Sequence, residues 1–83
     1  MKVLYFAWLR AKTGIGEEAV EPPPEVNDVS TLIAWLKQRG PGHSAAFADL
    51  ATVRVAVNQD YVPFDHPVKA GDEVAFFPPV TGG

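Results

Sequence analysis

The stretch DVSTLIAWLKQRGP, residues 28–41, contains the one clear helical pattern in this sequence of 83 residues. Its apolar side chains recur at i, i+3, i+4 and i+7, the spacing of one helix face, at Val29, Leu32, Ile33 and Leu36. Asp28 stands before this face as a good N-cap, and Lys37 and Arg39 follow in the last turn, where cations favour the helix dipole. Gly40 is placed for the C′ position and Pro41 prevents continuation. The stretch therefore predicts one amphipathic helix.

Two predicted strands precede this helix. Residues 2–9, KVLYFAWL, form a continuous apolar run that is typical of a strand buried on both faces. Residues 10–16 contain two glycines and are expected to form a turn or a short helical turn. Residues 17–21, EEAVE, fit a second, mostly exposed strand that pairs with the first as a hairpin. The triple proline at residues 22–24 forbids ladder hydrogen bonds and so separates the hairpin from the helix.

Further strands are predicted after the helix. Residues 41–51 read as a connection, with a short helical turn around residues 45–50. Residues 52–58, TVRVAVN, alternate valine with other residues and predict a strand. The turn at residues 58–60 leads to a short return strand at Tyr61 and Val62, and a turn at residues 70–72 leads to a last strand from Glu73 to Phe77.

The predicted order is strand, strand, helix, strand, short strand, strand, which favours an α+β fold of the ubiquitin-like β-grasp type. A mixed sheet would pack against the one main helix, with the first and last strands as central parallel neighbours. Another small α+β sandwich is the alternative. We expect one domain, residues 1–77, followed by a flexible tail, residues 78–83, that protrudes and ends in Gly82-Gly83.

Composition excludes several function classes. The net charge of −3 supplies no basic stripe for phosphates, so neither nucleic acid nor an anionic membrane surface is an expected partner. The short apolar N-terminus lacks the features of a signal peptide, and no segment has the length of a membrane span. The absence of cysteine fits the cytoplasm, where we expect the protein, and excludes a thiolate nucleophile or a side-chain persulfide.

Side-chain catalysis is not expected. His43 and His66 lie in predicted loops without a second metal ligand at a suitable spacing, so no metal site is predicted. The carboxylates at residues 60, 65 and 72 have neighbours typical of turns, and Glu17 and Glu18 resemble a solvated strand face. The chain alone is therefore not expected to be an enzyme.

The tail offers a different chemistry. Pro78-Pro79 forms a stiff stem after the last strand, and Thr81-Gly82-Gly83 loses side chains progressively, so the tail could enter a narrow channel. The ordinary interpretation is a frayed chain end. The alternative uses the carboxylate of Gly83: ATP would activate it as an acyl-adenylate, and a sulfur nucleophile would replace AMP to leave a thiocarboxylate. Such a group carries sulfur without cysteine, and Gly82 would let the tail thread.

The ending GDEVAFFPPVTGG, residues 71–83, resembles the signature ending of the molybdopterin synthase small-subunit family. The stretches VAVNQ, residues 55–59, and KVLYFA, residues 2–7, followed by Leu9-Arg10, resemble its strand and turn before that ending and its first strand. The resemblance implies a β-grasp sulfur carrier of molybdenum cofactor biosynthesis. An E1-like adenylyltransferase would adenylate Gly83 with ATP, and a sulfur-donor protein would supply the sulfur. No permanently bound cofactor is implied.

The resemblance also implies a partner. The carrier would dock on the large synthase subunit, as a heterotetramer, and donate sulfur to cyclic pyranopterin monophosphate to build the molybdopterin dithiolene. Docking needs an interface, and each aromatic candidate for it could equally belong to the core. The expected interface residues are Phe6, Trp8, Arg10, Tyr61, Phe76, Phe77, Pro78, Pro79, Val80 and Thr81.

Three other functions stay open from the residues. A thiamine-pathway sulfur carrier and a ubiquitin-like modifier would share the fold and the Gly82-Gly83 ending. The Phe76-to-Val80 stem argues against the thiamine-pathway carrier. A non-catalytic β-grasp interaction module would carry the same tail without using it.

Overall fold

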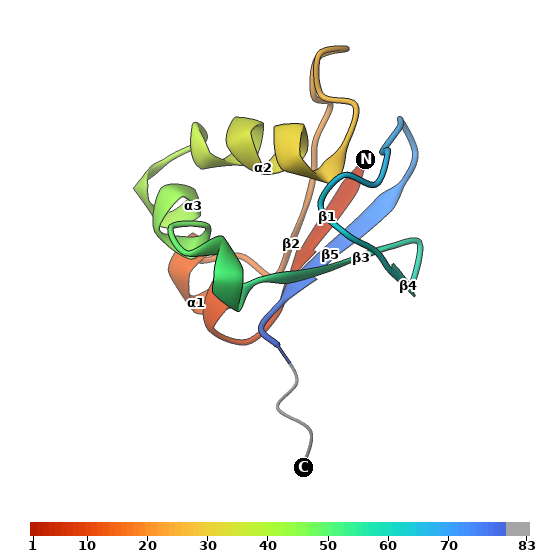
Figure 1. Ribbon diagram of the computed structural model, residues 1–83. Helices are drawn as coiled ribbons and strands as arrows, with labels where there is room; N and C mark the ends of the chain where they lie inside the picture. The colour runs from red at the N-terminus through yellow and green to blue at the C-terminus, as the bar shows by residue number, and fades with distance from the viewer. Residues whose placement is uncertain (80–83) are drawn as a thin grey trace.

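The computed structural model describes residues 1–79 and contains a mixed five-stranded sheet (Figure 1). The strands are β1 (Lys2–Tyr5), β2 (Glu17–Ala19), β3 (Arg54–Val57), β4 (Asp60–Tyr61) and β5 (Glu73–Phe77), in the spatial order β2-β1-β5-β3-β4. β1 and β5 are parallel, and the other neighbouring pairs are antiparallel. The predicted central parallel pair of first and last strands is confirmed, and the last strand has the predicted bounds.

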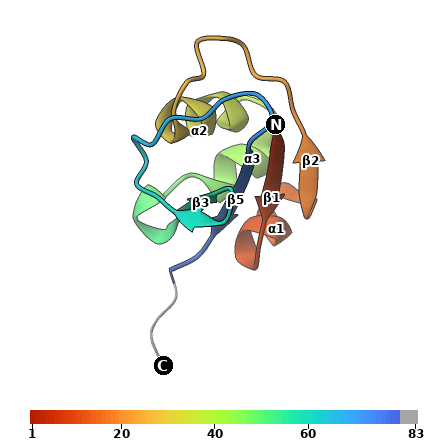
Figure 2. The same ribbon diagram turned by 90° about the vertical axis from the view of Figure 1, so that its right-hand side faces the viewer.

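The helices all cover one face of this sheet. They are α1 (Trp8–Thr13), α2 (Val29–Lys37), α3 (Pro41–Ala46) and the 3-10 turn η1 (Leu50–Thr52). Figure 2 views the sheet from its other face, which no helix of the described residues covers. The chain leaves β5 at the end of the sheet opposite to its N-terminus (Figure 1). Because β5 runs parallel to β1, Pro78 and Pro79 follow it at the end of the sheet where β1 also ends.

Helix α2 confirms the predicted amphipathic helix and its N-cap. The Asp28 carboxylate accepts a hydrogen bond of 2.8 Å from the Thr31 backbone N–H, and the Thr31 hydroxyl accepts one of 3.1 Å from the Asp28 N–H. The predicted C-terminal end of this helix was wrong in detail. The C-cap is Gln38 in a right-handed conformation, and Gly40 instead precedes α3, where Pro41 is the first helical residue. Proline suits that position because the N–H it lacks would have no helical partner there.

The first strand is shorter than predicted. β1 ends at Tyr5, and Ala7 has a positive φ of 54°, which breaks the extended backbone before α1 begins at Trp8. Trp8 and Arg10 are therefore helical residues, not strand residues. Burial on both faces was also wrong, because Val3 and Tyr5 face the core while Lys2 is exposed and Leu4 half-buried.

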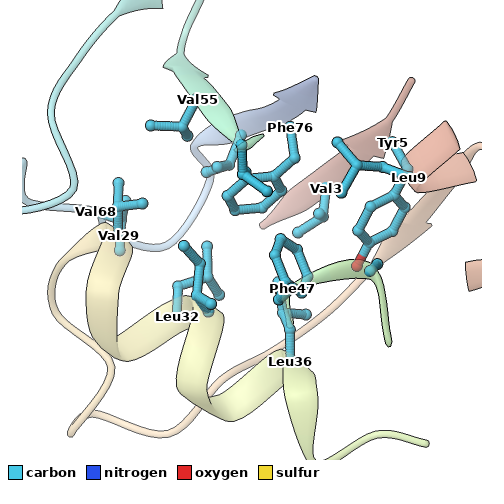
Figure 3. Packing of buried hydrophobic residues seen from close by; sticks show 14 of the residues in the cluster. Val3, Tyr5, Leu9, Val29, Leu32, Leu36, Phe47, Val55, Val68 and Phe76 are labelled. Carbon is cyan, nitrogen blue, oxygen red and sulfur yellow. The ribbon is translucent and has the colours of Figure 1, made fainter. Parts of the chain in front are cut away.

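The core lies between the sheet and the three helices (Figure 3). Strand residues that face the helices pack against the apolar face of α2 and against Phe47, which follows α3. Three aromatic side chains, Tyr5, Phe47 and Phe76, form its centre: the Phe47 and Phe76 ring centroids lie 4.9 Å apart, edge to face, and the Tyr5 and Phe76 rings stack at 6.3 Å. This centre fixes β5 to its neighbours.

The remaining connections mostly follow the prediction. Asn58 and Gln59 form the tight turn between β3 and β4 with positive φ values of 51° and 72°. The helical turn expected around residues 45–50 is instead two segments, α3 and η1. Within residues 1–79, no helix has the length and apolarity needed to cross a membrane.

Candidate functional site

The site predicted from the sequence begins where β5 ends. Gly82 and Gly83, together with Val80 and Thr81, lie outside the described residues. Pro78 and Pro79 are the last described residues and follow β5 directly, both half-buried. The structure therefore defines the root from which the tail starts.

Strand β5 holds this root in place from both sides. It is parallel to β1 over four residue pairs and antiparallel to β3 over four more. Its residues alternate, with Val74 and Phe76 buried and Ala75 and Phe77 half-buried on the opposite face. Phe76 is 0% exposed and packs against Tyr5 and Phe47. Its assignment to the partner interface was therefore wrong: a side chain at the centre of the core is not available to a partner.

The other face of the sheet carries an apolar area beside the root, which we call the root patch: Phe6, Tyr61 and Phe77. The Phe6 side chain is 48% exposed and that of Tyr61 is 79% exposed. The Tyr61 and Phe77 ring centroids lie 5.3 Å apart, and the Phe6 N–H donates to the Phe76 carbonyl at 3.1 Å, which places Phe6 beside the end of β5. Exposed aromatic groups of this kind are typical anchors of protein interfaces.

Helix α1 carries the other two predicted interface residues. Trp8 is its first residue and is 36% exposed. Arg10 is exposed, and its guanidinium lies close to Gly16. A Cβ atom at residue 16 would lie only 3.2 Å from the guanidinium carbon, so glycine at this position leaves room for the Arg10 side chain. Arg10 and Phe6 line one shallow depression at the end of β1. This places Arg10 close to the root patch although it belongs to a helix.

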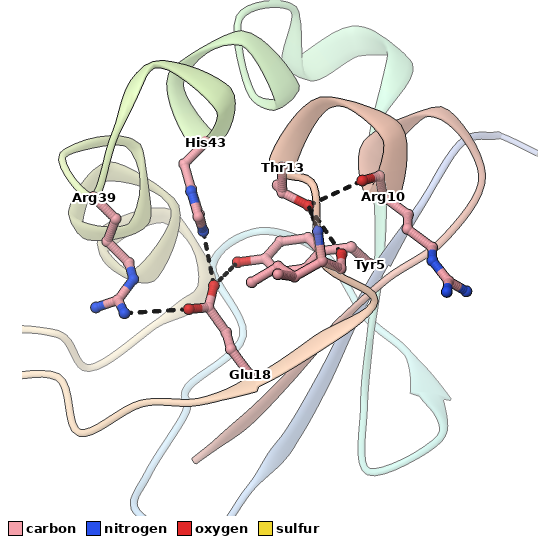
Figure 4. Close-up of polar contacts among 7 residues, drawn as sticks. Tyr5, Arg10, Thr13, Glu18, Arg39 and His43 are labelled. Carbon is pink, nitrogen blue, oxygen red and sulfur yellow. Dashed lines mark hydrogen bonds and ion pairs between the residues drawn. The ribbon is translucent and has the colours of Figure 1, made fainter.

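A partly buried polar cluster was missed by the sequence analysis (Figure 4). Glu18 of β2 does not face solvent: its side chain is 12% exposed, because the register places it opposite Val3 on the helix-covered face. Its Oε2 accepts a 2.7 Å hydrogen bond from the Tyr5 hydroxyl and lies 2.8 Å from His43 Nε2, and its Oε1 lies 3.2 Å from Arg39 Nη2. We call these four residues, Tyr5, Glu18, Arg39 and His43, the Glu18 cluster.

The cluster shifts the pKa values of Glu18 and Tyr5 in opposite directions. Burial by itself raises the pKa of Glu18, but hydrogen bonds from Tyr5 and His43 and the charge of Arg39 outweigh it, so the pKa lies below the ordinary value. The same carboxylate and, above all, burial raise the pKa of the Tyr5 hydroxyl. Because an ionised carboxylate only accepts, His43 Nε2 must carry the hydrogen that it shares with Glu18. The cluster joins β1, β2 and the α2–α3 region.

A second carboxylate, Asp72, confirms the expected turn role. It is 5% exposed and accepts from the Asn58 side-chain amide at 3.1 Å and from the Lys69 N–H at 2.9 Å. Burial raises its pKa, yet these bonds and the Lys69 charge bring the net pKa below the ordinary value. In residues 1–79, no three histidine, aspartate or glutamate side chains gather in a way that could hold a metal ion.

Comparison with known proteins decides the family. The ThiS family model matches residues 3–83, which is nearly the whole chain. The chain belongs to the ThiS family.

Relatives of this ThiS-family chain align with it from end to end. The molybdopterin synthase sulfur carrier subunit of Escherichia coli (strain K12) is 42% identical over 83 residues, which cover 100% of this chain and 99% of that protein. A Pyrococcus furiosus protein named as a candidate molybdopterin converting factor, subunit 1, has a similar structure, with a TM-score of 0.77, 40% identity and 95% of each chain covered.

A third similar structure comes from a complex. It is the protein–protein complex of subunits 1 and 2 of the molybdopterin-converting factor from Helicobacter pylori 26695, with a TM-score of 0.65, 25% identity, and 99% of this chain and 96% of that chain covered. The resemblance predicted from residues 2–10, 55–59 and 71–83 is confirmed, and so is the ubiquitin-like β-grasp fold.

Proposed function

We propose that this chain is the sulfur-carrying small subunit of a molybdopterin synthase. The observation that carries the proposal is its 42% identity, over its whole length, to the E. coli sulfur carrier subunit. In this proposal the chain is the sulfur-donating subunit of a heteromeric synthase and is not an enzyme by itself. It supplies one reactive group, the C-terminal carboxylate of Gly83, and the partners do the chemistry on it.

The reaction proceeds through acyl activation. The Gly83 carboxylate attacks the α-phosphorus of ATP on an E1-like enzyme, which releases pyrophosphate and leaves an acyl-adenylate. A sulfur-donor protein then delivers sulfur at the sulfide oxidation level, this sulfur attacks the acyl carbon, AMP leaves with the electron pair of the broken acyl–oxygen bond, and a thiocarboxylate remains. ATP is consumed by the activating enzyme and no cofactor stays bound to this chain. Gly82 and Gly83 lack Cβ atoms, so the acyl carbon stays unhindered and the tail can thread.

The thiocarboxylate then gives its sulfur to cyclic pyranopterin monophosphate in the large synthase subunit. The Gly83 acyl carbon stays bonded to this sulfur as a thioester until water cleaves the acyl–sulfur bond, which leaves the sulfur on the pterin, adds one oxygen to the acyl carbon and restores the Gly83 carboxylate. Because the dithiolene contains two sulfur atoms, two carrier cycles are needed for each product. The protein acts in the cytoplasm, where these enzymes would meet it.

The sheet face presents the tail to its partner. The root patch of Phe6, Tyr61 and Phe77 forms the centre of the interface, and Trp8 and Arg10 border it. Residues 78–81 continue from the same point into the partner's active site. A complex of subunits 1 and 2 is known for the similar H. pylori protein, which supports a large-subunit partner here. Two carriers and two large subunits would form the heterotetramer.

Intact-mass spectrometry tests the carrier chemistry. The chain is incubated with ATP, an E1-like enzyme and a sulfur donor, and the expected product has one oxygen replaced by sulfur, located on Gly83 by fragmentation. A variant with one residue added after Gly83 is the matched control, and it should fold normally and gain no sulfur. If the native chain gains nothing while the enzyme converts its own carrier, the proposal fails. A ladder of conjugates on a denaturing gel would instead identify a modifier.

A further inference from the structure

A groove lies beside the root patch, at the outer edge of β3. It has a volume of about 380 Å³, and it is lined by apolar side chains such as Leu50, Pro63 and Phe77 and by one charged side chain, Arg54. The Leu50 side chain at its border is 38% exposed. Nothing in the proposed chemistry of Gly83 uses this groove.

The groove exists because β4 is too short to cover β3. β4 has only two residues. The Val62 N–H, which follows them, donates to the Val55 carbonyl at 3.2 Å, and Pro63, which has no N–H, ends the pairing with β3. The chain then crosses to the start of α2, where the Phe64 carbonyl accepts from the Ser30 N–H at 2.9 Å. The first half of β3 is left without a neighbouring strand on this side.

Arg54 occupies this open edge. Its Nη1 donates to the Val53 carbonyl at 3.1 Å and to the Ala51 carbonyl at 3.2 Å, which holds the guanidinium over the edge of β3. Among residues 1–79, no carboxylate lies within 4.0 Å of it. A guanidinium has five N–H donors, so those on Nε and Nη2 stay available to a carboxylate from another molecule.

The groove is continuous with the surface that meets the partner. Phe77 lines the groove, belongs to the root patch and precedes the Pro78-Pro79 stem. A protein that receives the tail must approach to contact distance of this stem. The same protein therefore covers at least the Phe77 and Tyr61 side of the groove.

We propose that this groove binds a segment of the large synthase subunit that carries an apolar side chain next to an aspartate or glutamate. The apolar side chain enters between Leu50, Pro63 and Phe77, and the carboxylate pairs with Arg54. Arginine paired with a carboxylate beside an aromatic anchor is a frequent source of interface energy. This inference rests on the proposed function, because it takes the large subunit to be the protein that receives the tail.

Affinity for the purified large subunit, measured by calorimetry with the full-length chain, tests the inference. Arg54→Glu should weaken binding by roughly 10- to 100-fold, the lower part of the range for close interface charge pairs, and Arg54→Lys should be less severe. Lys37→Glu, an exposed charge reversal on α2, is the matched control and should change the affinity by less than about twofold. Raising the salt concentration should weaken native binding more than that of Arg54→Glu.

A photocrosslinking side chain at position 50 gives a second measurement that does not depend on the folding of an Arg54 variant. The crosslinked large-subunit peptide should contain an apolar residue adjacent to an aspartate or glutamate. A peptide without a carboxylate, no crosslink within a formed complex, or unchanged affinity of a folded Arg54→Glu would each overturn the inference.

Sulfur loading by the activating enzyme separates the two proposals. If the native chain and Arg54→Glu both gain sulfur on Gly83 but bind the large subunit equally, the groove proposal fails and the carrier proposal stands. If the native chain gains no sulfur, the carrier proposal fails whatever the groove binds.

Discussion

Replacing Glu18 by alanine should destabilise the protein far more than its position on a short edge strand suggests. Glu18 is the shared acceptor of the Glu18 cluster, with contacts of 2.7 Å to Tyr5, 2.8 Å to His43 and 3.2 Å to Arg39. The alanine variant removes all three contacts at once. The Tyr5 side chain is 1% exposed, so its hydroxyl cannot turn to bulk water without a movement of the core.

The magnitude follows from these three losses. A buried hydroxyl left without a partner costs about 1–3 kcal/mol, and the partly exposed Arg39 contact contributes at most about 1 kcal/mol. The His43 contact, with a side chain 13% exposed, adds about 1 kcal/mol. We expect a total loss of about 2–5 kcal/mol in the free energy of unfolding, which corresponds to a fall in Tm of about 8–40 °C for a domain of this size.

Urea denaturation followed by circular dichroism measures this loss, with Glu17→Ala as the matched control. Glu17 is the preceding residue, and it faces the other side of the sheet, where it pairs with Lys2 at 3.5 Å and is 63% exposed. Its removal should cost less than about 0.5 kcal/mol. A double-mutant cycle with Tyr5→Phe should give a coupling of about 1 kcal/mol or more, because both changes break one hydrogen bond.

Two results would refute this reasoning. Equal stabilities of the Glu18→Ala and Glu17→Ala variants would mean that the buried cluster adds nothing over a surface ion pair. Strict additivity of the Glu18 and Tyr5 variants would mean that the hydroxyl does not depend on the carboxylate.

Three further predictions concern acid, packing and the two faces of β5. The pKa of Glu18 is lower in the folded state, so its contribution to the free energy of unfolding is complete above the ordinary glutamate pKa of about 4.3. This contribution is lost as the pH falls through the folded-state pKa. In urea denaturation between neutral pH and about pH 3, Glu18→Ala should therefore lose less stability than the native chain. Gly42→Ala would place a Cβ against the Lys12 carbonyl oxygen, where α3 packs on α1. We expect the free energy of unfolding, measured by thermal denaturation, to fall by about 1–3 kcal/mol. An unchanged Tm would contradict this packing. Phe76→Ala should cost about 3–5 kcal/mol of stability, whereas Phe77→Ala should mainly weaken large-subunit binding, and a reversed pattern in denaturation and calorimetry would contradict the assigned faces.

Elements with a local chemical signal could be predicted from the sequence. Helix α2 was predicted because its apolar spacing and the Asp28 cap agree, and β5 because the turn at Gly71 and the prolines at residues 78 and 79 bound it on both sides. Each of these signals lies within a few residues of the element that it defines. The central parallel pair of first and last strands was predicted because both segments are apolar, whereas the places of β3 and β4 in the sheet come from the structure.

The misses occurred where the deciding contact is not local. The run KVLYFAWL is apolar throughout, and the break at Ala7 has no glycine or proline to mark it, so the start of α1 at Trp8 was not visible. Whether Glu17 or Glu18 faces the helices depends on pairing with β1, because a shift of one residue exchanges the faces of a strand. Strand alternation places Phe76 and Phe77 on opposite sides of β5, but only the fold shows which of the two faces the core.

The structure joins the Glu18 cluster to the tail root through one side chain. Tyr5 donates to Glu18 at its hydroxyl and stacks its ring on Phe76, the buried residue of β5 next to Phe77. A carrier binds its partner more tightly when the root of its tail is already ordered, because binding then does not have to pay the entropy of ordering the sheet. The polar cluster on the helix side and the proposed interface on the open side thus act on the same strand. A loss of the cluster should weaken binding only as far as it loosens β5, so Glu18→Ala should reduce the affinity for the large subunit near its Tm and leave it nearly unchanged well below.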